Sequence, residues 1–175
     1  MKRKPLDEQG LWQYAVRALG ARAHSAAEMR TKLMARANRQ EDVEGILARL
    51  AEYGYLNDVR FAEMVAGTRL ETQGFGKARV LRELRQRRVA SGTAEEAAAR
   101  TFAGVDEMEL AAQYLQRRIL RHGPLLDEPK QLASAYGKLR RAGFPTPVIL
   151  TVLKRHARDP ELLDTFEEPP EETAG

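Results

Sequence analysis

Few side chains in this sequence could carry catalytic or metal chemistry, and their spacing does not bring them together. The 175-residue chain has three histidines (His24, His122 and His156) and no cysteine. It contains no HExxH zinc pattern, no paired-carboxylate signature and no phosphate loop of the Walker type. Without cysteine, neither a disulfide framework nor a thiolate metal site can form. We therefore expect no catalytic residue, no metal, no cofactor and no enzymatic activity.

Two short stretches allow a chemical alternative. His24 stands beside Ser25, a pairing that could activate a nucleophile, but we expect no acid to orient the histidine. Ser25-Ala26-Ala27-Glu28 is instead a capping box at the start of a helix. Gly74-Phe75-Gly76-Lys77 could present free amides to an anion, although it lacks P-loop spacing and is predicted to follow a helix. We interpret it as a helix junction.

Basic side chains are the strongest candidates for a binding function. A helix predicted over 77–88 carries six basic residues and one acid, with Val80, Leu81 and Leu84 on its buried side and Arg79 and Arg82 opposite. Further clusters involve Arg118, Arg140, Lys154 and Arg155. The candidate binding residues, called the basic set below, are Arg60, Arg69, Lys77, Arg79, Arg82, Arg85, Arg117, Arg121, Lys138 and Arg141. For any one of them the alternative is a solvated side chain.

The charge is distributed unevenly along the chain. Residues 159–175 contain seven acidic and no basic side chains, so the rest of the chain holds all 29 basic residues against 18 of the 25 acidic ones. A body this basic indicates an anionic partner, either nucleic acid or an acidic protein groove, although ordinary colloidal charge is the alternative. The acidic tail is expected to be disordered and solubilising, or else to fold back on the basic body and compete with the partner.

Composition and periodicity predict an all-α fold. Ala, Leu, Arg and Glu abound, 43% of residues are hydrophobic, and no apolar run reaches the roughly 20 residues that span a bilayer. The basic N-terminus lacks the apolar core of a signal peptide, so we expect a cytoplasmic chain with no membrane contact. Apolar stripes include Leu11, Trp12, Ala15, Val16 and Leu19, and later Phe61, Met64 and Val65. Thr93 with Glu96 predicts a second capping box.

Nine predicted helices fall into three groups of three. Lys32-Leu33, Glu83-Leu84 and Lys138-Leu139 occupy matching places in the middle helix of each group. Tandem three-helix repeats of this kind pack into an elongated, curved helical array. The predicted boundaries are a flexible basic arm (1–5), repeat 1 (6–54), repeat 2 (55–104), repeat 3 (105–157) and the acidic tail (158–175).

The junction between the first two repeats is the most recognisable stretch of the chain. Gly54 is expected to end a helix in the left-handed conformation, with Tyr55 packing back against that helix. Asn57 is expected to cap the next helix, with Asp58 favourable at its positive end. Leu56 and Phe61 flank this cap as a hydrophobic staple. These six residues form the predicted structural junction.

The residues from Gly54 to Ala62, from Gly76 to Leu84 and from Ser25 to Leu33 closely resemble the bacterial regulatory protein family RecX. The resemblance covers about residues 10–157 and excludes the acidic tail. It implies a curved three-repeat protein without catalytic residues that binds the RecA recombinase. Such a protein lies in the groove of RecA filaments on single-stranded DNA. There it inhibits recombinase, ATPase and co-protease activities, and so modulates recombination and the SOS response.

The resemblance names no residue that carries inhibition, so the basic set rests on the helical wheel alone. The expected partners are RecA and its filament on single-stranded DNA, with weak direct DNA binding, and the chain is expected to be a monomer. The alternative function is a helical-repeat protein that binds nucleic acid directly through its basic faces.

Overall fold

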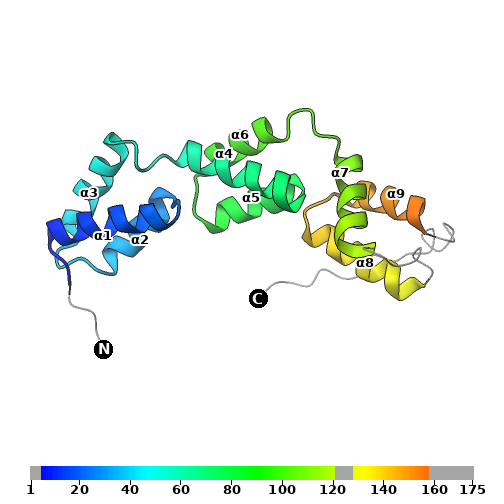
Figure 1. Cartoon of the computed structure of the whole chain (residues 1–175), viewed down its shortest axis with the longest axis horizontal. Helices are drawn as coiled ribbons and strands as arrows, with labels where there is room; N and C mark the ends of the chain where they lie inside the picture. The colour runs from blue at the N-terminus through cyan, green and yellow to red at the C-terminus, as the bar shows by residue number, and fades with distance from the viewer. Residues whose placement is uncertain (1–4, 121–127, 158–175) are drawn as a thin grey trace. The chain divides into compact units, whose positions relative to one another are not determined.

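The computed structural model describes residues 5–120 and 128–157, and their regular structure is mainly helical (Figure 1). An isolated bridge joins Leu6 and Ala37. The helices are α1 (Glu8–Ala21), α2 (Ala26–Met34), α3 (Glu41–Glu52), α4 (Asp58–Thr68), α5 (Lys77–Gln86), α6 (Ser91–Thr101), α7 (Glu107–Tyr114), α8 (Pro129–Arg141) and α9 (Thr146–His156), with π-helical segments η1 (Arg69–Gln73) and η2 (Leu115–Leu120). The predicted all-α class is confirmed. No helix in these ranges is both long enough and apolar enough to cross a membrane.

The chain divides into two compact units. Unit 1 comprises residues 1–67 and 81–101, and unit 2 comprises residues 68–80 and 102–175. Helix α5 therefore begins in unit 2 and continues in unit 1. The predicted repeats (6–54, 55–104 and 105–157) divide the chain differently from these two units. The repeat boundaries therefore stay a prediction.

The core of helices α1 to α3 follows the apolar spacing of the sequence. Leu11 and Ala15 on α1, Met29 and Leu33 on α2, and Val43, Ile46 and Leu50 on α3 are fully buried in one cluster with Leu56. Within each helix, successive buried residues are three or four positions apart, so each helix presents one apolar stripe to the others. The segment before α1 is attached by Leu6, whose backbone bonds to Arg36 and Asn38.

Matching positions are buried along the chain. Leu33, Leu84 and Leu139 each have no exposed surface. The third helix of the first group buries Val43 and Ile46, and α9 buries Ile149, Val152 and Leu153 in equivalent places. Helix α6 buries Ala94, Ala97 and Ala98 there. These buried side chains are smaller than those at the matching positions of α3 and α9.

The junction has the predicted caps. Gly54 has a φ of 71° and donates to Ala51, while Tyr55 donates to Leu50, so α3 ends in a Schellman motif. The side-chain oxygen of Asn57 accepts from the Arg60 amide at 3.0 Å, which caps α4. Gly54 and Asn57 therefore have the roles that their residue types predict.

Two helix boundaries differ from the prediction. Helix α6 begins at Ser91, and the Ala94 amide bonds to Ala90, so Thr93 lies inside the helix and the predicted Thr93–Glu96 capping box is wrong. Because the Ala94 amide closes the first turn on Ala90, Thr93 is the third residue of α6 and does not cap it. Helix α5 ends at Gln86, earlier than the predicted 88, because Arg88 adopts a left-handed φ of 57°.

Unit 2 depends on a close backbone crossing between two glycines. A Cβ on Gly76 would lie 2.5 Å from the Gly143 carbonyl oxygen, and a Cβ on Gly143 would lie 2.6 Å from Cβ of Arg79. The Gly76 amide donates to Ala142 at 2.8 Å across this crossing. The first turn of α5 is thereby held against the loop between α8 and α9. The neighbouring core buries Leu132, Tyr136 and Leu139 of α8.

We expect Gly143→Ala to lower the free energy of unfolding of unit 2 by about 2–4 kcal/mol. The new methyl group would be forced into the α5 backbone, and Gly143 has a φ of 97° that other residues adopt only with strain. Urea unfolding measures the change. Gly45→Ala is the control, because Gly45 lies inside α3 with nothing within 4 Å of an added Cβ. A Gly143→Ala chain as stable as this control would contradict the crossing.

Candidate partner-binding surfaces

Helix α5 exposes two arginines of the basic set in unit 1. Arg82 is exposed and has no ion pair with any residue that the structure describes. The Arg85 guanidinium lies 3.8 Å from the Glu95 carboxylate, and both side chains are about 60% exposed. An ion pair this exposed contributes little stability, so the guanidinium groups of Arg82 and Arg85 are both available to an anionic partner.

Arg79 does not project into solvent as the helical wheel predicts. Its side chain is half-buried, its Nε is buried without a hydrogen-bond partner, and its guanidinium lies 5.5 Å from the ring centroid of Phe75. The reason is the Gly143 crossing, which covers a side of the first α5 turn that an isolated helix leaves open. Lys77, in the same turn, is also half-buried. The predicted exposed orientation of Arg79 is therefore wrong.

The last two basic residues of the predicted α5 stretch have structural contacts. Arg87 is half-buried, pairs with Glu83 at 3.1 Å and lies over the Phe61 ring. Arg88 occupies the left-handed position that ends α5, and its guanidinium lies 3.3 Å from the Thr31 hydroxyl. Charge counting along the sequence therefore overstates the number of free cations on this helix.

Unit 2 places its basic residues on separate elements. Arg117 on η2 is exposed and lines a polar hollow of about 250 Å³ between η1 and η2. Next to it, the Arg118 guanidinium donates to the Thr72 carbonyl oxygen at 3.2 Å. Lys138 and Arg141 are exposed in the last turn of α8. Arg69 lies in η1, half-buried and with an interaction partner. Arg121 lies outside the described residues, as does the acidic tail.

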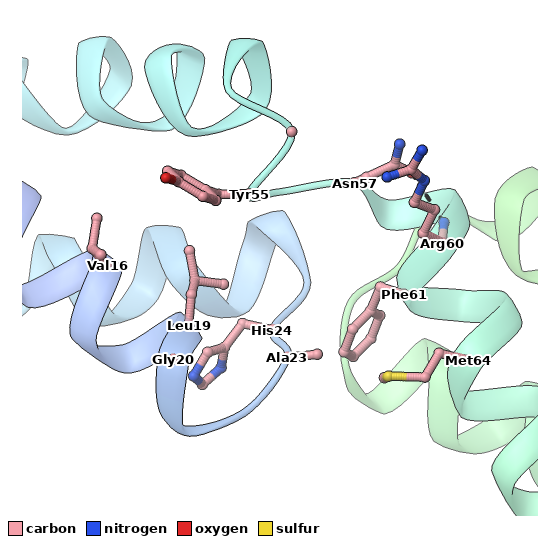
Figure 2. Close-up of a pocket in the computed structure, with 11 residues that line it drawn as sticks. Val16, Leu19, Gly20, Ala23, His24, Tyr55, Asn57, Arg60, Phe61 and Met64 are labelled. Atoms are coloured by element: carbon pink, nitrogen blue, oxygen red, sulfur yellow. Dashed lines mark hydrogen bonds between the residues drawn. The ribbon is translucent and has the colours of Figure 1, made fainter.

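Arg60 belongs to a different surface, an open groove in unit 1. The groove has a volume of about 590 Å³, and its principal lining residues are Val16, Leu19, Tyr55, Arg60, Phe61 and Met64. Figure 2 shows Phe61 and Met64 of α4 facing Leu19 and His24 across this hollow. These residues define the unit 1 groove. The sequence predicts Val16 and Met64 as core residues, but they are 39% and 48% exposed, so that prediction is wrong.

Beside the groove, the N-terminus of α2 is a buried polar junction that sequence reasoning finds only in part. The Ser25 hydroxyl accepts from the Glu28 amide at 3.1 Å, and the Glu28 carboxylate lies 3.3 Å from the Ser25 amide, which confirms the capping box. The same hydroxyl donates to the Arg87 carbonyl oxygen at 2.6 Å. The Ala26 amide donates to the Asp58 carboxylate at 2.8 Å. These five residues form the Ser25 junction, which ties α2 to α4 and to the end of α5.

An acid does orient His24, contrary to expectation. Its Nδ1 lies 3.3 Å from the Glu28 carboxylate, and the ring is almost fully buried. The neighbouring Ser25 hydroxyl is nevertheless committed to the Arg87 carbonyl and the Glu28 amide. Structural bonds thus occupy the hydroxyl that a nucleophile would need free. In the described ranges, no group of three His, Asp or Glu side chains could hold a metal ion.

The backbone amides just before α5 show whether Gly74–Lys77 could bind an anion. The Gly74 amide donates to Leu70, the Phe75 amide to Arg69 and the Gly76 amide to Ala142. These three donors are used within the chain and are not free to bind an anion. The helix-junction interpretation agrees with this geometry.

Comparison with known proteins gives one consistent result. A family described as "RecX, second three-helix domain" matches residues 57–97. The regulatory protein RecX of Deinococcus radiodurans is 35% identical over 156 residues, covering 89% of this chain and 72% of that protein. The regulatory protein RecX of Amycolatopsis mediterranei is 31% identical, with 81% and 79% covered. These relatives are named as regulatory proteins, not as enzymes.

Solved structures agree on the fold. The crystal structure of RecX from Lactobacillus salivarius has a TM-score of 0.64 at 17% identity and covers 85% of this chain and 95% of that one. A second crystal structure of regulatory protein RecX has a TM-score of 0.67 at 19% identity, covering 83% of this chain and 72% of that one. At this level of identity the similarity shows a shared helical-repeat fold.

The burial of His24 predicts a pH dependence of stability. Burial lowers the pKa of His24 from its ordinary 6.5, and the Arg22 charge lowers it further, against the opposing hydrogen bond to Glu28. The unfolded chain therefore binds this proton at a higher pH than the folded chain. The contribution of neutral His24 to the free energy of unfolding is fully present above pH 6.5. It is lost as pH falls from 6.5 toward the pKa of His24 in the folded chain, by at most about 1.4 kcal/mol per pH unit.

Urea unfolding of wild type and His24→Gln between pH 5 and 8 measures this dependence. We expect the stability of wild type relative to the variant to decrease below pH 6.5. Burial alone would raise the pKa of Glu28, but the hydrogen bond and charge of Arg22 and the Ser25 amide lower it below 4.5. The contribution of Glu28 therefore changes only below this pH range. Parallel pH curves for the two chains would rule out His24 as the titrating group.

Proposed function

Because the chain belongs to the RecX family of regulatory proteins, we propose that it binds the RecA recombinase and its filaments on single-stranded DNA. Bound there, it inhibits the recombinase, ATPase and co-protease activities and so modulates recombination and the SOS response. The protein acts in the cytoplasm as a monomer and needs no cofactor. Its three-helix repeats are the units that contact successive positions along the filament.

The observation that carries this proposal, besides family membership, is the set of exposed cations on α5. Arg82 has no ion pair with a described residue, and Arg85 has only a long, solvent-exposed one. A filament groove offers acidic protein surface and nearby phosphates, and either can pair with these guanidinium groups.

We expect the double variant Arg82→Glu, Arg85→Glu to require about tenfold more protein for half-maximal inhibition of RecA ATPase on single-stranded DNA. The reversal replaces attraction by repulsion at two exposed positions, and tenfold corresponds to about 1.4 kcal/mol. Helicity by circular dichroism should not change, because neither side chain is buried.

The matched control is Arg17→Glu, Arg30→Glu, which changes the net charge equally at exposed positions outside the basic set. This control should inhibit like wild type. If both double variants inhibit RecA ATPase as well as wild type does, the α5 surface is not the contact. If both inhibit it equally weakly, the effect comes from net charge and not from the α5 surface.

A second candidate function, direct binding of nucleic acid, is favoured by the exposed cations of unit 2. Arg117 projects from η2, and Lys138, Arg141, Lys154 and Arg155 are exposed on α8 and α9. Cations on surface helices can track a phosphate backbone without reading base sequence.

This candidate predicts affinity for single-stranded DNA without RecA, with the logarithm of the binding constant falling linearly against the logarithm of salt concentration. Lys138→Gln with Arg141→Gln should reduce the slope by about 1–2, since each lost phosphate contact removes about 0.7 for a single strand. Fluorescence anisotropy with a labelled oligonucleotide at several salt concentrations measures the slope. Absence of binding at low salt would eliminate this function.

A further inference from the structure

The unit 1 groove gathers apolar surface that the fold does not bury. Among the described residues, six large hydrophobic side chains are exposed, and three of them (Val16, Tyr55 and Met64) line the groove. Soluble chains seldom concentrate exposed apolar side chains in one hollow without a binding role. The groove is thus a candidate binding surface of unit 1 that the α5 arginines do not use.

The shape of the groove is suited to a side chain of a partner. Its volume of about 590 Å³ lies in the range of pockets that hold a small ligand or a few side chains. Phe61 is nearly buried and Leu19 is half-buried, while the small residues Gly20 and Ala23 leave room between them (Figure 2). The Ser25 junction ties α2 to α4, and the hollow itself lies between α4 on one side and α1 with the loop that follows it on the other.

The charge of the groove is one-sided. Arg60 is the only ionised side chain among the lining residues, and no acidic side chain lines the hollow. The Arg60 amide bonds to Asn57, while its exposed guanidinium has no partner among the described residues. His24 has a lowered pKa because it is buried, so it adds no second cation at neutral pH. The rim therefore favours one negative charge beside an apolar interior.

We infer that the unit 1 groove docks a short segment of a partner protein that presents a large apolar side chain next to a carboxylate. The apolar side chain fills the hollow between Leu19, Phe61 and Met64, and the carboxylate pairs with Arg60. A nucleic acid is a poorer occupant, because the groove offers one cation and mostly apolar walls. The inference rests on the proposed function in assuming a protein partner, and it adds an anchor separate from the α5 arginines.

Two fluorescent dyes test the chemistry of the groove without any partner. The probes are 8-anilinonaphthalene-1-sulfonate, which is apolar and anionic, and the uncharged N-phenyl-1-naphthylamine. We expect Met64→Glu to weaken binding of both dyes to the full chain at least about fivefold, because it places a charge in the apolar wall. Arg60→Glu should weaken only the anionic dye. Dye binding that neither substitution changes would overturn the inference.

Two exposed hydrophobic residues outside the groove provide controls. Met34→Glu and Val59→Glu change side chains of similar exposure, 39% and 43%, on α2 and α4. Both should bind the dyes like wild type, and all four variants should keep the helicity of wild type. If the controls weaken binding as much as Met64→Glu, the dyes report general surface hydrophobicity and the groove assignment fails.

Binding to RecA then separates this inference from the proposed function. We expect Met64→Glu to bind RecA at least about fivefold more weakly than Met34→Glu does. If wild type binds RecA and the two variants bind equally, the groove is not an anchor although the proposed function stands. If wild type does not bind RecA, the proposed function fails, and the dye results alone decide the groove chemistry. The full chain can also be compared with a chain that ends at Ala157. If only the shorter chain binds the dyes, the occupant of the groove is the tail of this chain, and the assignment to a partner protein is overturned.

Discussion

The buried start of helix α2 is the contact on which unit 1 depends. One hydroxyl, Ser25 Oγ, accepts from the α2 backbone and donates to the end of α5, while the next amide donates to the first carboxylate of α4. Ser25 is fully buried, so a lost partner would leave a polar group without water. Because helices from both sides of the Gly54 turn converge here, the junction determines where α4 lies relative to α2. It thereby shapes the groove that Phe61 and Met64 line.

Unit 2 uses a different constraint, close backbone contact in place of a polar junction. Gly76 and Gly143 approach so closely that neither tolerates a Cβ, and their contact aligns the first turn of α5 with the end of α8. One consequence concerns the basic residues. Arg79 is drawn into this contact and stacks on Phe75, whereas Arg82, one turn later, remains exposed. Backbone packing thus selects which cations on one helix remain available to a partner.

Local signals in the sequence predict the local features well. Gly54, Asn57 and the Ser25–Glu28 pair adopt the caps that their residue types favour, because capping depends on neighbours within four residues. The helical wheel fails where tertiary contacts cover a second side of a helix, as at Arg79. Likewise, Val16 and Met64 have core-like spacing, but the linker at Tyr55 leaves them facing an open groove. The third partner of Ser25, the Arg87 carbonyl 62 positions away, has no local signature.

Membership of the RecX family and the exposed arginines of α5 together support regulation by contact with a recombinase filament. Titrating the wild-type chain into RecA assembled on single-stranded DNA while following ATP hydrolysis tests that claim most directly. We expect ATP hydrolysis to fall to a low plateau as the folded chain is added. The same concentrations of a denatured chain, added as a control, should leave hydrolysis unchanged. Unchanged hydrolysis with the folded chain in excess over RecA would contradict it.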